Sequence, residues 1–194
     1  QTSLITTINH LLSFQIMLSK KLKLLCNPYL LGIGLLLSLG SCGENNQYKQ
    51  LLADNYYLIE ANESLTETLV HDIFSPPVAS RIYAYPSIAS YEIVALSAPD
   101  KYVSLMGQLN KSKPLSVDPS AYPKANYQLA SLAAYYKVAL QLIFTEQFLI
   151  ENRDNLFEKI QSAGMPDEEF EASIALGDAV AEEILAYASE DNYH

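Results

Sequence analysis

The chain has 194 residues, of which 49% are hydrophobic and 18% are charged, enough apolar residues for one globular domain with a sizeable core. Its formal net charge is -10, but nine of the 12 basic and all 22 acidic residues lie from Cys42 onward, which leaves that part at -13. So acidic a part argues against binding to nucleic acid and against direct adhesion to anionic lipid headgroups.

The first 41 residues read as upstream residues followed by an export signal. Residues 1–16 lack a clear helical stripe or cap, and we interpret them as upstream of the true start at Met17. A basic start then precedes a short apolar run, Tyr29–Leu39, which is the pattern of a secretory signal. The basic residues are Lys20, Lys21 and Lys23.

The end of this signal resembles the lipobox of bacterial lipoproteins. Leu39-Gly40-Ser41-Cys42 has an aliphatic residue, two small residues and then the cysteine that would be acylated. We therefore predict a signal peptide over 17–41 and a lipid attached to Cys42, which would anchor the protein in a bacterial cell envelope, facing the periplasm or in the outer membrane. The alternative is a membrane-spanning helix, but the uninterrupted run is shorter than the ~20 residues that a span needs.

Cysteine usage agrees with this interpretation. The other cysteine, Cys26, lies within the signal, so the mature domain would keep no thiol for a disulfide or a metal.

Residues 42–63 are expected to form a tether and a first helix. Gly43–Gln47 is polar, Tyr48–Ile59 carries one apolar side, and Glu60–Glu63 predicts a break. The helical domain would then occupy 64–194, beginning with a capping box at Ser64 that opens a short helix.

The segment Ser75–Leu96 is predicted to be the buried helix around which the other elements pack. Pro76 and Pro77 suit its first turn, and apolar residues recur at helical spacing on nearly every side. Pro86 lies inside the pattern and should kink the helix. We expect a helical bundle wrapped around this segment.

The remainder is predicted to be helical as well. A short helix over Tyr102–Leu109 precedes Asn110–Lys124, which is either a linker or an ordered surface loop. Three helices are then expected, over Asn126–Phe144, from Thr145 to a stop at Gly164, and from Pro166 onward. Since no segment alternates apolar and polar residues over the length of a strand, the fold class is all-α.

Three polar residues are singled out, all with a structural role as the favoured interpretation. Arg81 and Glu92 lie near the two ends of one face of the predicted central helix and would find partners on other helices. His71 precedes Asp72, but adjacent residues on a helix do not face each other, so the pair is not a ready-made dyad. We predict no catalytic residue and no metal site, and we interpret the acidic residues after Pro166 as a solvated helix face.

A resemblance adds to these predictions. The block from His71 to Tyr85, HDIFSPPVASRIYAY, followed by Ile88-Ala89 and Tyr91-Glu92, resembles the first-helix region of bacterial lipoproteins related to vanadium-dependent haloperoxidases. These share a superfamily with the type 2 phosphatidic acid phosphatases. The resemblance extends roughly from Leu65 to the end of the chain and implies vanadate-dependent halide oxidation or phosphate-ester hydrolysis in a full-length protein.

The catalytic motifs that this resemblance implies are missing. The superfamily holds its oxyanion with a Lys leading to Arg-Pro, a Pro-Ser-Gly-His and a Ser-Arg leading to a His. Here the only arginines are Arg81 and Arg153, neither followed by proline, and no Pro-Ser is followed by Gly-His.

Two interpretations follow from the missing motifs. Either the chain is the N-terminal, non-catalytic part of such a protein, whose C-terminal catalytic half would carry vanadate or phosphate and pack on this domain, or it is a stand-alone helical binding or scaffold lipoprotein.

Overall fold

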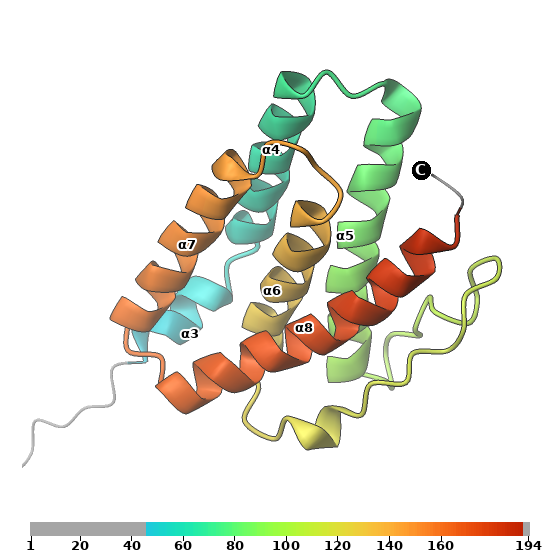
Figure 1. Cartoon of the computed structure of the whole chain (residues 1–194). Helices are drawn as coiled ribbons and strands as arrows, with labels where there is room; N and C mark the ends of the chain where they lie inside the picture. Colours follow the sequence, from blue (N-terminus) through green and yellow to red (C-terminus); the bar gives the residue numbers. More distant parts are fainter. Residues whose placement is uncertain (1–45, 192–194) are drawn as a thin grey trace, which may run out of the picture. The chain divides into compact units, whose positions relative to one another are not determined.

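The computed structural model describes residues 46–191, which form helices and loops without a strand (Figure 1). The α-helices are α3 (Gln47–Leu52), α4 (Tyr56–His71), α5 (Pro76–Ser97), α6 (Tyr127–Leu140), α7 (Gln147–Ser162) and α8 (Asp167–Ser189), with a 3₁₀ helix at Pro119–Ala121. The predicted all-α fold class is confirmed. The predicted upstream residues, the signal peptide and Cys42 lie outside the described residues. Within the described part, no helix is both long enough and apolar enough to span a bilayer.

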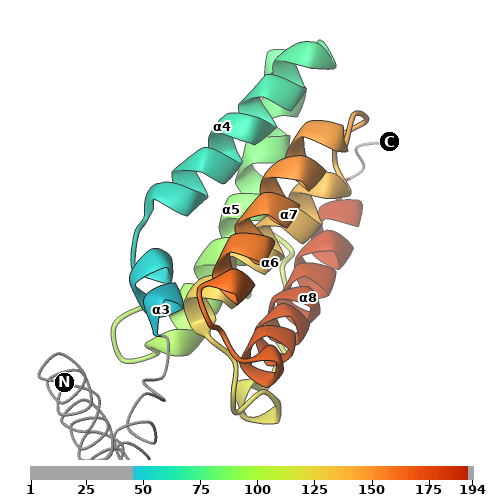
Figure 2. The ribbon, with the colours of Figure 1, turned by 90° about the vertical axis from the view of Figure 1, so that its left-hand side faces the viewer.

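The centre of the bundle is α6, and the prediction that the segment 75–96 occupies it is wrong. Eleven of the 14 residues of α6 are buried, whereas only eight of the 22 residues of α5 are. Helix α5 exposes Ser80, Ala84 and Ser87 along one side, so this helix faces solvent along part of its surface. Figures 1 and 2 show α6 enclosed by α4 and α7 on one side and by α5 and α8 on the other.

The two faces of α6 contribute to two parts of the core. Leu129, Tyr135 and Tyr136 pack with residues of α3, α4 and α7. Ala130, Ala134 and Val138 face the second part, which α5 and α8 complete. Leu129 and the two tyrosines therefore lie toward α3, α4 and α7, and the smaller side chains lie toward α5 and α8.

The small face of α6 lets α8 approach closely. Gly177 of α8 lies against the backbone of α6, and a Cβ at this glycine would be 2.6 Å from the carbonyl oxygen of Ala130 and 2.8 Å from the Cβ of Ala133. The alanines of α6 therefore leave room for the backbone of α8 to come close.

Several helix ends follow local sequence rules. Pro76 and Pro77 occupy the first turn of α5, where a missing N–H costs least. Ser75 is the N-cap residue, but its side chain makes no capping hydrogen bond. Asn126 caps α6, since its side chain accepts hydrogen bonds from the N–H groups of Gln128 and Leu129.

Two predicted boundaries are wrong. Helix α4 continues through Glu60–Glu63, because these polar residues belong mainly to the solvent side of an amphipathic helix whose inner side carries Tyr57, Ala61 and Leu65. The break lies earlier, where Asp54 accepts a hydrogen bond from the N–H of Tyr56. The predicted helix over Tyr102–Leu109 is a loop.

Of the two interpretations of Asn110–Lys124, the ordered surface loop is the one observed. Leu115, Val117 and Tyr122 pack against the second part of the core. The N–H of Ser116 donates to the carboxylate of Glu183 on α8, with distances of 3.0 and 3.2 Å to its two oxygens. The loop therefore covers the bundle rather than separating two domains.

Candidate functional site

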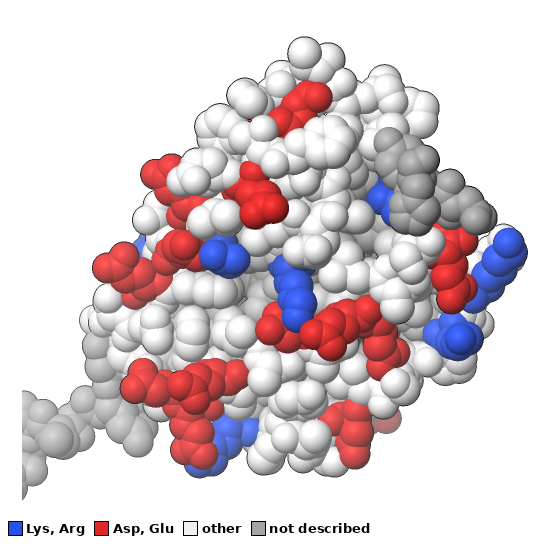
Figure 3. Space-filling view, in the orientation of Figure 1, with Lys and Arg blue, Asp and Glu red and all other residues white. Residues whose placement is uncertain are grey.

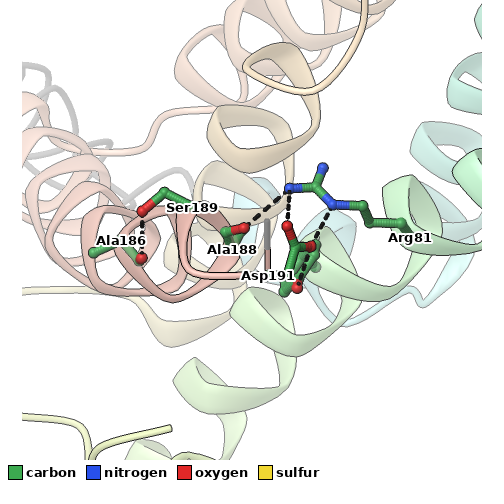
Figure 4. A network of polar contacts seen from close by, with 6 residues as sticks. Arg81, Ala186, Ala188, Ser189 and Asp191 are labelled. Atoms are coloured by element: carbon green, nitrogen blue, oxygen red, sulfur yellow. Dashed lines mark hydrogen bonds and ion pairs between the residues drawn. The ribbon is translucent and has the colours of Figure 1, made fainter. Parts of the chain in front are cut away.

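Arg81 joins α5 to the end of α8. Its Nε and Nη2 donate to the two carboxylate oxygens of Asp191, and Nη2 also donates to the carbonyl oxygen of Ala188 at 3.0 Å (Figure 4). A guanidinium that binds a carboxylate through two N–H groups is held in a defined orientation. The guanidinium also donates to a carbonyl in the last turn of α8. Its positive charge therefore interacts favourably with the negative end of that helix dipole.

Tyr85 belongs to the same network. Its hydroxyl donates to Asp191 at 2.9 Å, and the Arg81 guanidinium lies 5.0 Å from the centre of its ring. Burial, the hydrogen bond to Asp191 and the nearby negative charge raise the pKa of Tyr85 to about 12. The network therefore carries one cation, one carboxylate and a neutral phenol, and it fastens α8 to α5.

Glu92 is fully buried and holds the loop that follows α5. Its Oε1 accepts hydrogen bonds from the N–H of Leu105 at 2.7 Å and of Met106 at 3.2 Å. Oε2 is buried without a hydrogen-bond partner among the described residues. The expected partner on another helix is thus replaced by two backbone N–H groups of a loop.

His71 and Asp72 lie at the end of α4, and here the structure corrects the expectation that they do not meet. Asp72 is the C-cap residue of α4, with a helical backbone conformation, and its Oδ1 lies 3.2 Å from Nδ1 of the preceding His71. Oδ2 accepts from the N–H groups of Phe144 and Thr145, at 3.2 and 3.0 Å. Asp72 therefore ties the α4–α5 connection to the α6–α7 connection.

The charge state of Asp72 follows from these contacts. Burial alone would raise the pKa of its carboxyl, but hydrogen bonds from Thr145, His71 and Phe144 outweigh it and lower the pKa to about 2. The exposed His71 thus has a structural role, as expected, and its partner is the neighbouring Asp72.

The acidic residues of α8 are more than a solvated face. Glu169 accepts a hydrogen bond from the hydroxyl of Tyr48 at 2.8 Å, and Asp178 and Glu182 flank Lys137 of α6. Such partners lie far away in the sequence, and no local signal identifies them. Among residues 46–191, no group of three or more His, Cys, Asp or Glu side chains could hold a metal ion.

A cleft of about 390 Å³ opens between the start of α4 and the neighbouring parts of α5 and α6. At its base the hydroxyls of Ser90 and Ser131 lie 2.6 Å apart, both nearly inaccessible to solvent. Its walls are partly apolar, with Leu58 and Val94 among them. A volume of this size is within the range of small-molecule pockets.

These residues do not build an oxyanion site. A vanadate or phosphate group needs several converging cationic or N–H donors. The two arginines of the described chain lie on different helices, and Arg81 is paired with Asp191 while Arg153 is paired with its neighbour Asp154. The donor set of this part of the chain therefore does not fit vanadate.

Among solved structures, this chain is similar to a bacterial vanadium-dependent iodoperoxidase, with 39% sequence identity and a TM-score of 0.66. The match covers 71% of this chain and 32% of the iodoperoxidase chain, so this chain spans about a third of that protein's length. The predicted resemblance to the vanadium haloperoxidase superfamily is confirmed. The sequence matches no protein-family model and no curated protein.

Proposed function

We propose that this chain is the N-terminal, helical and non-catalytic part of a longer, membrane-anchored protein related to the vanadium-dependent haloperoxidases. The observation that carries the proposal is the match at 39% identity to about a third of an iodoperoxidase, combined with a described chain whose donors do not fit the oxyanion.

In the complete protein, a C-terminal half would supply the converging donors and pack on this domain. The chemistry would be vanadate-dependent halide oxidation or phosphate-ester hydrolysis, which need the same kind of oxyanion site. Similarity to an iodoperoxidase favours the first, with iodide as the halide to test before others. The present chain would contribute a scaffold in which α6 fixes the surrounding helices.

An activity comparison tests this proposal. The 194-residue chain and the protein made from the extended reading frame are each assayed with vanadate, hydrogen peroxide and iodide, and separately with a phosphate monoester. We expect the present chain to be inactive and the extended protein to oxidise iodide only after vanadate is added. An extended reading frame without a Pro-Ser-Gly-His motif would contradict the proposal.

The anchor is a second element of the proposal, and the lipobox ending at Cys42 supports it. Two or more acyl chains give stable membrane attachment, since each buried CH₂ contributes ~0.8 kcal/mol. Expression with labelled palmitate should label the wild type and leave Cys42→Ser unlabelled. Equal incorporation into both proteins would exclude acylation at this residue.

A stand-alone binding or scaffold lipoprotein is the alternative, and the 390 Å³ cleft with its Ser90–Ser131 pair favours it. The two proposed functions differ in whether a catalytic half follows this chain and covers part of its surface. A reading frame that ends with this chain, together with a monodisperse protein that binds no hydrophobic dye, would support the binding lipoprotein over the enzyme.

A further inference from the structure

The solvent side of α5 carries no charged side chain. We name this side the α5 face, and it consists of Ser80, Ala84, Ser87, Tyr91 and Val94, which are exposed or half-buried. From Ser75 to Pro99 the sequence has two charged residues, and both are turned toward other partners. They are Arg81, which bonds to the end of α8, and Glu92, which is fully buried. A helix side that stays in water ordinarily carries charge, so the α5 face is a candidate contact surface.

Charge is frequent on the helices around this face. Helix α8 carries seven acidic residues, and Figure 3 shows acidic groups spread over the side of the molecule that α7 and α8 form. Helix α4 has three glutamates, which line a pocket against α7 rather than α5. They are Glu60, Glu63 and Glu67. Charged side chains near the α5 face lie at its two ends, with Arg81 and Asp191 at the first and Asp54, Asp100 and Lys101 at the second. The length between these ends is uncharged.

The hydroxyl groups of the α5 face already have acceptors. Ser80 and Ser87 each donate to the carbonyl oxygen four residues earlier, at 2.9 and 2.7 Å. The hydroxyl of Tyr91 donates to the carbonyl oxygen of Val103 at 3.0 Å. Covering this face would therefore leave none of these three donors unpaired, and an unpaired buried donor is what makes the burial of polar groups costly.

The 390 Å³ cleft adjoins the α5 face. Val94 belongs to both, because it lines the cleft and follows Ser87 by seven residues, which places the two on the same side of the helix. Leu58 of α4, 39% exposed, forms part of the opposite wall. The hydroxyl of Tyr83 donates to Thr66 of α4 at 2.8 Å and joins the two helices that form the walls. Small side chains beside a groove suit a packed helix, since helices approach to 8–10 Å by setting ridges into grooves.

The end of α8 indicates which partner covers this surface. Asp191, the last described residue, is bound to Arg81 and Tyr85 on α5 (Figure 4). A chain that continues past α8 therefore starts beside the α5 face, and tethering gives it an effective concentration on the order of mM there. A second copy of the chain has no such advantage. The iodoperoxidase match covers 32% of that chain, so about two thirds of that protein lies outside the match.

We propose that the α5 face and the adjoining cleft form the surface on which the catalytic half of the longer protein docks, through a helix whose contacting side is uncharged. The inference rests on the proposed function, which supplies that half. The acidic surface of α7 and α8 stays in water in this arrangement. The cleft is then part of an interface within one protein, whereas in a stand-alone lipoprotein it would be open to a small molecule.

The accessibility of introduced thiols tests the docking surface. Ser87→Cys places a thiol on the α5 face, and Ser162→Cys is the matched control, because Ser162 is an exposed serine at the end of α7. Each variant is made in the 194-residue chain and in the protein from the extended reading frame. The rate of maleimide labelling is measured for both, and peptide mass spectrometry separates the introduced thiol from Cys26 and Cys42.

We expect Ser87→Cys to be labelled at least about tenfold more slowly in the extended protein than in the 194-residue chain, and Ser162→Cys to differ by less than about twofold, since a covered thiol is shielded from the reagent. The same slowing at both positions would overturn the proposal. Slowing at position 87 that already occurs in the 194-residue chain and grows with its concentration would overturn it in favour of a second copy.

A charge on the α5 face provides a second measurement. Ser87→Arg should leave the urea midpoint of the 194-residue chain unchanged and lower that of the extended protein, because a buried unpaired charge is costly. An unchanged midpoint in both proteins would contradict the docking surface.

Failure of the docking surface and failure of the proposed function are distinguishable. An extended protein that oxidises iodide with vanadate, yet labels Ser87→Cys as fast as the 194-residue chain does, overturns the docking surface alone. A reading frame that ends with this chain overturns both.

Discussion

Arg81 on α5 and Asp191 at the end of α8, 110 positions apart in the sequence, form an ion pair in which the guanidinium binds both carboxylate oxygens. Their side chains are 16% and 27% exposed, so solvent screens the pair only in part. The contact ties the last helix to a helix from the first half of the fold.

Replacing Arg81 by glutamine should therefore lower the free energy of unfolding by about 1–2 kcal/mol, since a charge-assisted pair and the bond to the Ala188 carbonyl are lost together. Urea denaturation measures the change. Arg153→Gln is the control, because that arginine pairs with its sequence neighbour and its loss should cost less than about 0.5 kcal/mol. Equal effects of both variants would show that the α5–α8 contact adds nothing.

Asp72→Asn tests the contact by which Asp72 joins the α4–α5 connection to the α6–α7 connection. The pKa of Asp72 is lowered to about 2 in the folded chain, against 3.8 for the ordinary group, so its stabilisation is present above pH 4 and is lost as the pH falls through about 2. We expect Asp72→Asn to cost about 1–2 kcal/mol at pH 7, after discounting for the surface position of the loops.

A pH series of urea midpoints checks this prediction. The difference between wild type and Asp72→Asn should shrink steadily below pH 4. The exposed Asp100 supplies the control, and Asp100→Asn should change little across the same series. A difference for Asp72→Asn that stays constant down to pH 2 would rule out the ionised carboxylate as its source.

Glu92 gives a prediction about the loop after α5. Glu92→Ala leaves the N–H groups of Leu105 and Met106 without their acceptor and opens space in the core, which should cost about 2–4 kcal/mol. Glu92→Gln keeps an oxygen acceptor and should cost less. Hydrogen exchange should report faster exchange of both amides in Glu92→Ala than in Glu92→Gln. The same rates in both variants would mean that the carboxylate does not hold the loop.

The contact between α6 and α8 is tested at Gly177. In an exposed helix, Gly→Ala would be stabilising by about 1 kcal/mol through helix propensity. Here the new Cβ would meet the backbone of Ala130, so we expect Gly177→Ala to be destabilising by about 1–3 kcal/mol. The exposed Ala175 provides the converse control, because Ala175→Gly should cost about 1 kcal/mol by propensity alone. A raised melting temperature for Gly177→Ala would contradict the close approach.

Helix positions were largely predictable from the sequence, because caps and apolar spacing are local signals. Asn126 marked the start of α6 and Pro76 the start of α5. The central position was assigned to the wrong helix, since periodicity reports which face is apolar and not how many neighbours cover it. In α6 the alanines and Ser131 are buried against neighbouring helices, whereas in α5 the side chains of Ser80 and Ser87 are exposed to solvent.

The polar contacts were less predictable, because they join distant positions. Nothing near Arg81 indicates Asp191, and the backbone donors to Glu92 carry no side-chain signature. His71 and Asp72 meet through their side chains at the C-terminal end of α4, a contact between sequence neighbours that helical periodicity does not indicate. The family resemblance, in contrast, rested on a contiguous block and was recognised from it.

The central proposal is that this chain provides the helical scaffold of a longer, haloperoxidase-related protein and does not itself hold the oxyanion. Calorimetric titration of the 194-residue chain with orthovanadate tests it most directly. We predict no saturable heat, because the two arginines of the sequence lie on different helices and each is paired with an aspartate. Saturable one-to-one binding that is abolished by Arg81→Gln would contradict the account.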